Sequence, residues 1–399
     1  MTLYGLPETV KFCSRCTMSN QRPNSCLEFE HTAESIKPTI HFDDEGICDA
    51  CRVAERKKNI DWEDRRFNLT QLLDKHRKHN GQYDCIIPGS GGKDSFYAAW
   101  MLKYEFGMHP LTVTWRPHLY TDWGWRNHTR WIDAGFDNIL FSPNGKTHRL
   151  LTRLAVENLL HPFQPFILGQ KQLAPRMAAL YNIPLVFYGE NEAEYGNPIA
   201  DTSTSERDWK YYTAETHDDI HLGGASIADI IHKHNVDLTD LEPYFPANPS
   251  LLKEKQIEVH YLGYYLKWVP QECYYFAHEH GGFETSDVRQ PGTYGKYNSI
   301  DDKIDDFHYY TTWIKYGIGR ATYDSSQEIR NSHIDRDEGI GLVKKFDGEY
   351  PQRFEKDIFE YLSVPGFKPM NREYFDRLCD KFRSPHLWDG RKLRHTIYG

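Results

Sequence analysis

Short apolar runs alternate with longer amphipathic segments through the middle of the chain. Apolar runs at 83–87, 110–115, 138–141 and 184–188 predict strands, and the segments between them have the spacing of amphipathic helices. This alternation predicts an α/β fold, in which a parallel, doubly wound sheet carries helices on both faces. Ligands of such folds bind at the carboxyl ends of the strands, so we expect the functional site there.

The pattern changes twice along the chain. Residues 1–60 are rich in cysteine, and beyond about residue 200 the strand signals fade into a mostly helical pattern. We therefore expect three regions: a cysteine module at 1–60, the α/β domain at 61–200, and a helical substrate-binding region at 201–399.

The composition narrows the class of protein further. A formal net charge of −9 argues against a general nucleic-acid binder, which needs a basic surface. The sequence shows no signal-peptide pattern at its start and no apolar run of the roughly 20 residues that a membrane-spanning helix needs. We expect a cytoplasmic protein that neither inserts into a membrane nor binds nucleic acid.

Five of the eight cysteines lie within the first 51 residues. Four of them form two Cys-x-x-Cys units, Cys13 with Cys16 and Cys48 with Cys51, a pattern typical of a tetrahedral structural zinc site. Four cysteine ligands leave no open coordination position, so we assign the ion a structural role. Unrelated reduced thiols and an iron–sulfur cluster are the alternatives. Cys26 is either a fifth thiol of this group or a buried side chain.

Residues 88–95, Pro-Gly-Ser-Gly-Gly-Lys-Asp-Ser, form a glycine loop between a predicted strand and a predicted helix. A Walker A loop is excluded because Ile87 stands at its first glycine position and Asp94 follows its lysine. A dinucleotide-binding loop is excluded because Asp94 stands where its third glycine is needed. The remaining pattern, Ser-Gly-Gly-x-Asp-Ser, resembles the PP-loop of the ATP pyrophosphatases, which cleave ATP to AMP and pyrophosphate.

The PP-loop pattern has a direct physical rationale. Its glycines let backbone N–H groups approach the phosphates, and the following helix directs its positive end at the same anion. Lys93 offsets phosphate charge, and Asp94 is expected to bind Mg²⁺ because a carboxylate fits poorly beside bare phosphate. The alternative is an N-capped strand-to-helix turn without a ligand. The expected ATP-binding residues are Ser90, Gly91, Gly92, Lys93, Asp94 and Ser95.

Several motifs together resemble the N-acetyl sugar amidotransferases, a family that makes acetamidino sugars for the O-antigen of lipopolysaccharide or for flagellar glycans. The most specific motif follows the last predicted strand and reads Tyr-Gly-Glu-Asn-Glu-Ala-Glu-Tyr-Gly-Asn at 188–197. The resemblance covers nearly the whole chain and also includes the Cys-x-x-Cys units, the glycine loop and the segments 112–115, 141–146, 161–166 and 297–308.

The resemblance implies an ATP-dependent reaction on a nucleotide-activated acetamido sugar. ATP adenylates the acetamido oxygen, pyrophosphate leaves, and ammonia then displaces AMP to form an amidine. In this reaction Mg²⁺ would screen the phosphates and Lys93 would stabilise the departing pyrophosphate. The chain has no glutaminase motif of its own. The family therefore implies a separate glutaminase, with a cyclase-like partner that channels ammonia.

Further candidate residues follow the predicted strands. Glu190 and Glu194 come directly after the strand at 184–188 and are candidates for Mg²⁺ binding, for holding the sugar, or for deprotonating the incoming ammonium. A solvated acidic loop is the alternative. Thr114 and Trp115 end the second strand, where related ATPases contact adenine, although Trp115 is equally suited to the core.

Three basic residues of the C-terminal half, Lys303, Lys315 and Arg320, are candidate contacts for pyrophosphate or an anionic nucleotide sugar. On a helix, Lys303 and Phe307 would share one face. The alternative is a solvated helix with surface ion pairs. His308 is expected to be structural.

Two other functions fit parts of the pattern. A PP-loop tRNA thiolase also combines cysteine knuckles with this loop, but it needs a basic RNA-binding face and a reactive cysteine near the loop. Cys85 lies within a predicted buried strand, and the chain is acidic. The second is a zinc-binding scaffold that binds nucleotide without turnover. The intact loop favours the amidotransferase.

Overall fold

A five-stranded parallel sheet forms the centre of the computed structural model, which describes residues 2–399, leaving aside the side chains at 200 and 201. The strand order is β3-β2-β1-β4-β7, so the chain winds outward from β1 in both directions. All four pairings are parallel, which confirms the predicted doubly wound α/β fold. The strands are β1 (Cys85–Pro88), β2 (Pro110–Trp115), β3 (Asp137–Phe141), β4 (Leu185–Tyr188) and β7 (Glu258–Tyr261).

The fifth strand was missed from the sequence. β7 is four residues long, Glu-Val-His-Tyr, and β4 is the one named strand with which it pairs among the described residues. Such a short segment with two polar positions has no clear strand pattern. Its pairing with β4 stabilises the extended conformation, which its own residues favour only weakly. The sheet therefore continues past the residue-200 boundary expected from the sequence.

Helices cover both faces of the sheet, as predicted. Alternate residues of β1 point to opposite sides. Ile86 packs into one core with the helices α5 (Gly145–Leu159) and α6 (Gln164–Tyr181). Ile87 packs into a second core, together with the helices α2 (Trp62–His76), α3 (Lys93–Trp100), α4 (Asp122–Asp133) and α12 (Pro270–Gly281).

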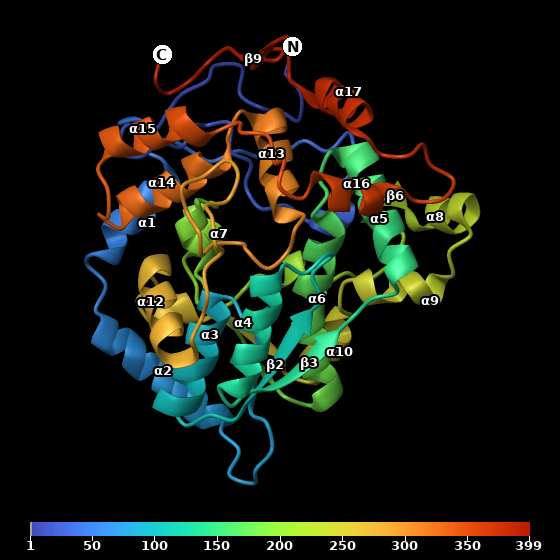
Figure 1. The fold of residues 1–399 in the computed structure, drawn as a ribbon. Coiled ribbons are helices and arrows are strands. Elements are labelled where there is room, and N and C mark those ends of the chain that lie inside the picture. The colour runs from blue at the N-terminus through green and yellow to red at the C-terminus, as the bar shows by residue number, and fades with distance from the viewer. Residues whose placement is uncertain (1) are drawn as a thin grey trace.

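The C-terminal region is mostly helical and lies above the carboxyl edge of the sheet in the view of Figure 1. Its segment 300–303 is bound to the start of α4, since Thr121 Oγ1 donates to the Ile300 carbonyl and the Leu119 N–H donates to Asp302 Oδ1. The helices of this region are α13 (Asp305–Tyr316), α14 (Arg320–Arg330), α15 (Arg336–Phe346), α16 (Glu355–Leu362) and α17 (Arg372–Phe382).

The cysteine-rich head packs against this C-terminal region. The helix α1 (Asp49–Lys57) begins within the second cysteine pair and contains Cys51. The hydrophobic core of the head includes Tyr316, Ile318 and Trp388 of the C-terminal region. Accordingly the two ends of the chain lie close together in Figure 1.

Short elements complete the fold. Across residues 2–399, no helix has the length and apolar character needed to cross a membrane. The short helices are α7 (Ile199–Thr202), α8 (Ile227–His234), α9 (Leu238–Leu241), α10 (Pro249–Glu254) and α11 (Leu262–Tyr265), and the hairpins are β5 (His221–Leu222) with β6 (Ala225–Ser226), and β8 (Trp388–Asp389) with β9 (Lys392–Leu393).

Candidate functional site

The glycine loop connects the end of β1 to the first residue of α3, at the carboxyl edge of the sheet. Gly91 has a φ of +85°, and a Cβ there would lie 2.7 Å from the His128 Cα of α4. Gly92 differs, because its φ is −66° and a Cβ there would meet only Ser90 Oγ, at 3.6 Å. The first glycine is therefore required by the fold itself, whereas the fold places no such demand on the second.

The polar side chains of the loop bond to each other and to neighbouring segments. Lys93 Nζ lies 2.5 Å from Asp94 Oδ2, and Trp268 Nε1 donates to Asp94 Oδ1 at 2.9 Å. Ser95 Oγ donates to the Gly92 carbonyl at 3.0 Å. Both oxygens of Asp94 thus already accept a hydrogen bond, one from the lysine expected to face phosphate. The backbone N–H groups at the start of α3 have no side-chain cap, which leaves them available to an anion.

The two predicted glutamates after β4 have different surroundings. Glu194 is buried and accepts a bond of 2.6 Å from Lys57 Nζ of α1, so its carboxylate links the strand-end loop to the cysteine head. Burial raises the pKa of Glu190, and the nearby charge of Asp94 raises it further. Gly189 brings this segment against the loop, since a Cβ there would lie 2.6 Å from the Asp94 carbonyl oxygen.

A cavity of about 370 Å³ opens beside the loop. Its wall combines the cysteine head, the glycine loop, the strand-end loop, the start of α12 and the C-terminal region. This volume falls within the range of small-molecule sites. The lining residues are Met18, Arg22, Lys93, Asp94, Tyr195, Trp268, Pro270, Asn298, Ser299, His308, Tyr309, Thr312, Tyr323, Asp324, Gln327 and Arg330.

Several of these residues were not singled out from the sequence. Arg22, Trp268 and the α14 pair Asp324 and Arg330 come from three separate segments, and none belongs to a recognisable local motif. Only the packing of the head and the C-terminal region over the sheet brings them to the loop. His308 lines the same cavity, and burial lowers its pKa to about 4, so it is neutral near pH 7.

The two residues predicted to contact adenine lie in the core. Thr114 is fully buried, and its Oγ1 accepts a bond of 3.0 Å from Asn138 Nδ2. Trp115 is also buried and stacks on Phe141 with 5.0 Å between ring centroids. The structure therefore matches the core alternative for Trp115.

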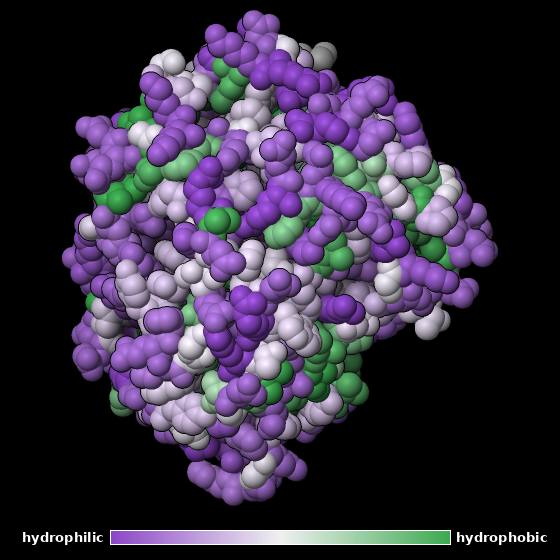
Figure 2. Space-filling model, in the orientation of Figure 1, coloured by the Kyte–Doolittle hydropathy of each residue, from purple (hydrophilic) through white to green (hydrophobic). Residues whose placement is uncertain are grey.

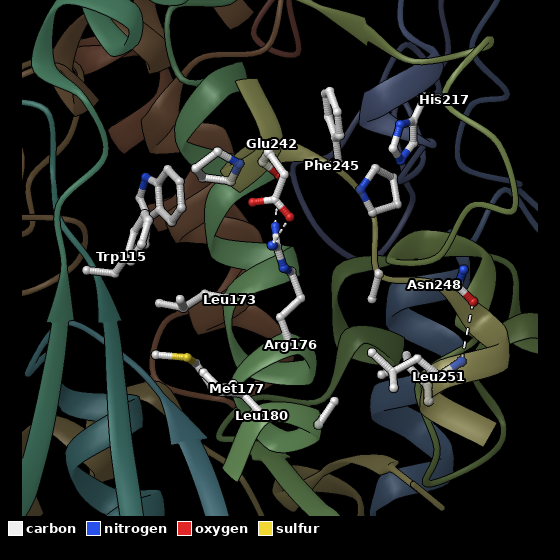
Figure 3. A pocket seen from close by; sticks show the side chains of 16 residues that line it. Trp115, Leu173, Arg176, Met177, Leu180, His217, Glu242, Phe245, Asn248 and Leu251 are labelled. Carbon is white, nitrogen blue, oxygen red and sulfur yellow. Dashed lines mark hydrogen bonds and ion pairs between the residues drawn. The ribbon is translucent and has the colours of Figure 1, made fainter. Parts of the chain in front are cut away.

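Trp115 also borders a second, largely apolar cavity of about 720 Å³ (Figure 3). Arg176 of α6 and Glu242 form an ion pair within it, and Leu180 and Leu251 are exposed at 75% and 43%. Figure 2 shows hydrophobic surface gathered in this region, near β3 and α10. The cavity has none of the glycine-loop residues in its lining.

The three basic candidates of the C-terminal half do not line the cavity beside the loop. Lys303 pairs with Asp357 at 2.7 Å, as in the ion-paired alternative. α13 begins only at Asp305, so Lys303 precedes the helix on which it was expected to share a face with Phe307.

Lys315 and Arg320 are buried behind the cavity wall. Lys315 Nζ donates to the Leu159 carbonyl at 2.8 Å, and burial, reinforced by the charge of Lys37, lowers its pKa to about 7. Arg320 donates to the Asn298 carbonyl, and its Nε lies 3.8 Å from Asp324 Oδ2. Only Arg320 thus touches residues of the cavity.

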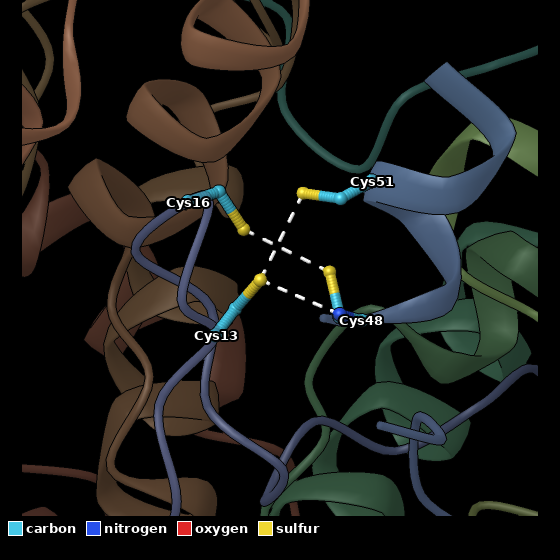
Figure 4. A group of neighbouring side chains, drawn as sticks. All are labelled: Cys13, Cys16, Cys48 and Cys51. Atoms are coloured by element: carbon cyan, nitrogen blue, oxygen red, sulfur yellow. Dashed lines mark hydrogen bonds between the residues drawn. The ribbon is translucent and has the colours of Figure 1, made fainter. Parts of the chain in front are cut away.

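The four paired cysteines form one buried cluster (Figure 4). The Sγ atoms of Cys13 and Cys51 are 3.8 Å apart, as are those of Cys16 and Cys48. A tetrahedral ion with metal–sulfur bonds of about 2.3 Å requires sulfur–sulfur separations of about 3.8 Å. The donors therefore fit a single tetrahedral metal ion. Arg336 of α15 fixes the first knuckle by donating to the carbonyls of Cys13 and Cys16.

Cys26 lies outside this cluster. Its Sγ donates to Glu28 Oε1 at 3.2 Å, and burial raises its pKa to about 11. His31 completes a small group of potential metal ligands. The charges of Lys37 and Lys171 act on the same thiol, and these cations disfavour a metal ion there.

The doubly wound sheet, the glycine loop at the end of β1 and the four-cysteine cluster together make up the predicted α/β fold, with the PP-loop pattern at the carboxyl end of its first strand. Residues 291–398 match the family described as "LPS biosynthesis protein WbpG-like, C-terminal domain". The match covers about a quarter of the chain, and its description agrees with the predicted resemblance to enzymes of lipopolysaccharide biosynthesis.

The chain is also similar to individual known proteins. An uncharacterized protein of Methanocaldococcus jannaschii, MJ1599, is 34% identical over 88 residues, which are 22% of this chain and 31% of that protein. The chain thus spans about a third of this curated relative.

Among solved structures, the U34-tRNA thiolase NcsA from Methanococcus maripaludis, with its [4Fe-4S] cluster, has a TM-score of 0.29 and 12% identity, over 82% of this chain and 87% of that one. A predicted subunit of tRNA methyltransferase from Methanocaldococcus jannaschii has a TM-score of 0.25 and 12% identity, over 61% and 92%. These TM-scores are too low to bear on the function of this chain.

The two loop glycines lead to different expected phenotypes. Gly91→Ala should lower the free energy of unfolding by at least about 2 kcal/mol, because alanine disfavours the positive φ and its Cβ meets α4. Gly92→Ala should change stability by less than about 1 kcal/mol. Urea denaturation of both variants checks this difference, and equal losses would contradict it.

The metal cluster is tested by cysteine replacement. Cys16→Ser should lose the bound ion and destabilise the protein, because three thiolates remain in a buried site built for four. The matched control Cys26→Ser should retain one ion per chain. Metal content measured by plasma mass spectrometry, together with thermal denaturation, tests which cysteines bind the metal. Metal loss in the Cys26 variant would show that the cluster is wrongly assigned.

Proposed function

We propose that the protein is an ATP-dependent amidotransferase that converts an acetamido group of a nucleotide-activated sugar into an acetamidino group. One observation carries this proposal. The cavity beside the glycine loop is walled by residues between 298 and 330, and these belong to the matched lipopolysaccharide-biosynthesis domain. The loop expected to bind ATP and the domain expected to bind the sugar therefore share one cavity.

The chemistry explains why ATP is needed. An acetamido carbon is a weak electrophile, and its oxygen is a poor leaving group. Attack of that oxygen on the α-phosphate of ATP gives an adenylated imidate and pyrophosphate. Ammonia then adds to the carbon, AMP departs, and a proton is lost to leave the amidine. The protein contributes mainly positioning and charge stabilisation.

The loop residues supply the ATP site in this proposal. The uncapped N–H groups at the start of α3 bind phosphate, and Ser90 and Ser95 add hydroxyl groups. Lys93 leaves Asp94 and binds the departing pyrophosphate. An oxygen of Asp94 would then be free to hold Mg²⁺. When bound, Mg²⁺ offsets the phosphate charge.

Glu190 is the proposed base. A carboxylate whose pKa is raised by burial takes a proton from ammonium or from the adduct more readily than an exposed one. Glu194 acts at a distance, since its pair with Lys57 holds the strand-end loop against the cysteine head.

We propose zinc for the four-cysteine cluster. The sulfur separations of 3.8 Å support one ion, whereas thiolates on the separate irons of a cubane cluster lie farther apart. Ammonia is proposed to come from a separate glutaminase with a channelling partner. A thiolase role is not favoured, because Cys85 lies at the start of β1, away from the loop at its other end, and is fully buried, and burial raises its pKa well above the ordinary value.

The reaction is tested directly with purified protein, ATP, ¹⁵N-ammonium and a panel of nucleotide-linked diacetamido sugars. Mass spectrometry should show one acetamido oxygen replaced by labelled nitrogen, with AMP and pyrophosphate formed in equal amounts. Glutamine should not replace ammonium for the chain alone. Unchanged sugars across the panel, with ATP intact, would contradict the proposed reaction.

The role of Glu190 predicts a pH profile. The base must be deprotonated and its pKa is raised, so kcat should rise with pH through a value above the ordinary range of glutamate. Glu190→Gln should lower kcat by about a hundredfold or more and abolish this rise of kcat with pH. Glu194→Gln should lower thermal stability, because it breaks the pair with Lys57, but kcat should still rise with pH. An unchanged rise of kcat with pH in the Glu190 variant would exclude Glu190 as the base.

A further inference from the structure

Two arginines in the cavity wall lack acidic partners. Arg22, from the cysteine head, is 8% exposed and contacts the ring of Tyr323, but no carboxylate among the described residues pairs with it. Among the described residues, the side chain of Arg330, at the end of α14, donates to the Glu194 carbonyl at 3.3 Å and forms no ion pair. One Nη1 nitrogen of each is buried without a hydrogen-bond partner. Buried charges normally find such partners, so this pair needs an explanation.

The remaining charges of the cavity do not balance the pair. Asp94 is neutralised by Lys93 at 2.5 Å, and Asp324 lies 3.8 Å from Arg320. His308 adds no charge near pH 7. With Arg320 behind the wall counted as the partner of Asp324, two guanidinium charges in the cavity wall remain without a carboxylate partner, which suits an anion that arrives with a ligand.

The four-cysteine cluster offers a competing explanation for the two unpaired arginines. The charges of Cys16, Cys48 and Cys51 act on Arg330, and a four-thiolate ion would carry negative charge there. Arg336 already bonds to the cysteine knuckle through backbone carbonyls. If Arg22 and Arg330 served only to offset the cluster, their replacement would release the metal and destabilise the protein.

We propose that Arg22 and Arg330 form a binding site for a diphosphate group. Guanidinium groups bind phosphate oxygens through paired, charge-assisted hydrogen bonds, and the hydroxyl-bearing rings of Tyr195, Tyr309 and Tyr323 line the same cavity. The inference rests on the proposed function, in which two ligands carry a diphosphate. One is the nucleotide-linked sugar, and the other is ATP with its pyrophosphate product.

The test measures equilibrium binding by calorimetry, with three probes and four proteins. The probes are uridine diphosphate, inorganic pyrophosphate and Mg²⁺-ATP. The proteins are the natural chain, Arg22→Gln, Arg330→Gln, and the control Arg377→Gln, whose side chain is 52% exposed on α17 and pairs with Glu373. Each cavity substitution should weaken at least one probe by about ten- to a hundredfold, and the control should weaken none.

The pattern among the probes identifies the source of the diphosphate. Selective loss of uridine diphosphate assigns the site to the sugar nucleotide, whereas joint loss of pyrophosphate and ATP assigns it to the ATP side. Arg22→Lys should bind more tightly than Arg22→Gln but less tightly than the natural chain, because it keeps the charge and loses the paired N–H donors of the guanidinium group. Unchanged affinity for all three probes would overturn the proposal.

Measurements of stability and metal content distinguish a ligand-binding role of Arg22 and Arg330 from a structural one. Replacing a buried, unpaired cation by a neutral side chain should leave the melting temperature equal or higher and the metal content unchanged. Loss of metal or a lower melting temperature would overturn the proposal in favour of charge balance at the cluster. Binding is measured without turnover, so absence of amidation with every sugar would count against the proposed function alone.

Discussion

Close backbone packing around the glycine loop is the constraint on which the rest of the site depends. A Cβ at Gly91 would lie 2.7 Å from the His128 Cα of α4, and one at Gly189 would lie 2.6 Å from the Asp94 carbonyl. A Cβ at Gly124 would lie 2.5 Å from the Asp301 Cα. These contacts bring α4, the end of β4 and the C-terminal region to the start of α3. A side chain at any of the three positions would push one wall away from the loop.

The cysteine cluster extends this arrangement to the other side of the cavity. Four buried thiols define the path of the head, and Thr17 Oγ1 bonds to Ser325 and Ser326 of α14 at 2.8 Å. The same segment carries Arg22 into the cavity wall. A site of structural type can therefore control ligand binding, because the residues between its knuckles form part of the binding surface.

The local sequence determined those features that depend on short-range chemistry. Four of the five sheet strands, the glycine loop and the four-cysteine cluster were predicted, since each has a periodicity or a ligand spacing that neighbouring residues decide. β7 was not predicted, because four residues carry too little pattern and their pairing with β4 is nonlocal. Lys303 was misplaced on a helix because the start of α13 depends on the contacts of residues 300–303 with α4.

By itself the sequence determined the class of fold, the glycine loop and the four clustered cysteines, because backbone geometry and ligand spacing restrict these features within short segments. Only the tertiary structure decided which charges face that loop. Glu190 and Glu194 are four residues apart, yet Lys57 binds the second alone. Arg22 and Arg330 are far apart in the chain, yet they line one cavity without acidic partners. The balance of charge in a cavity is set by segments distant in sequence, and no local motif records it.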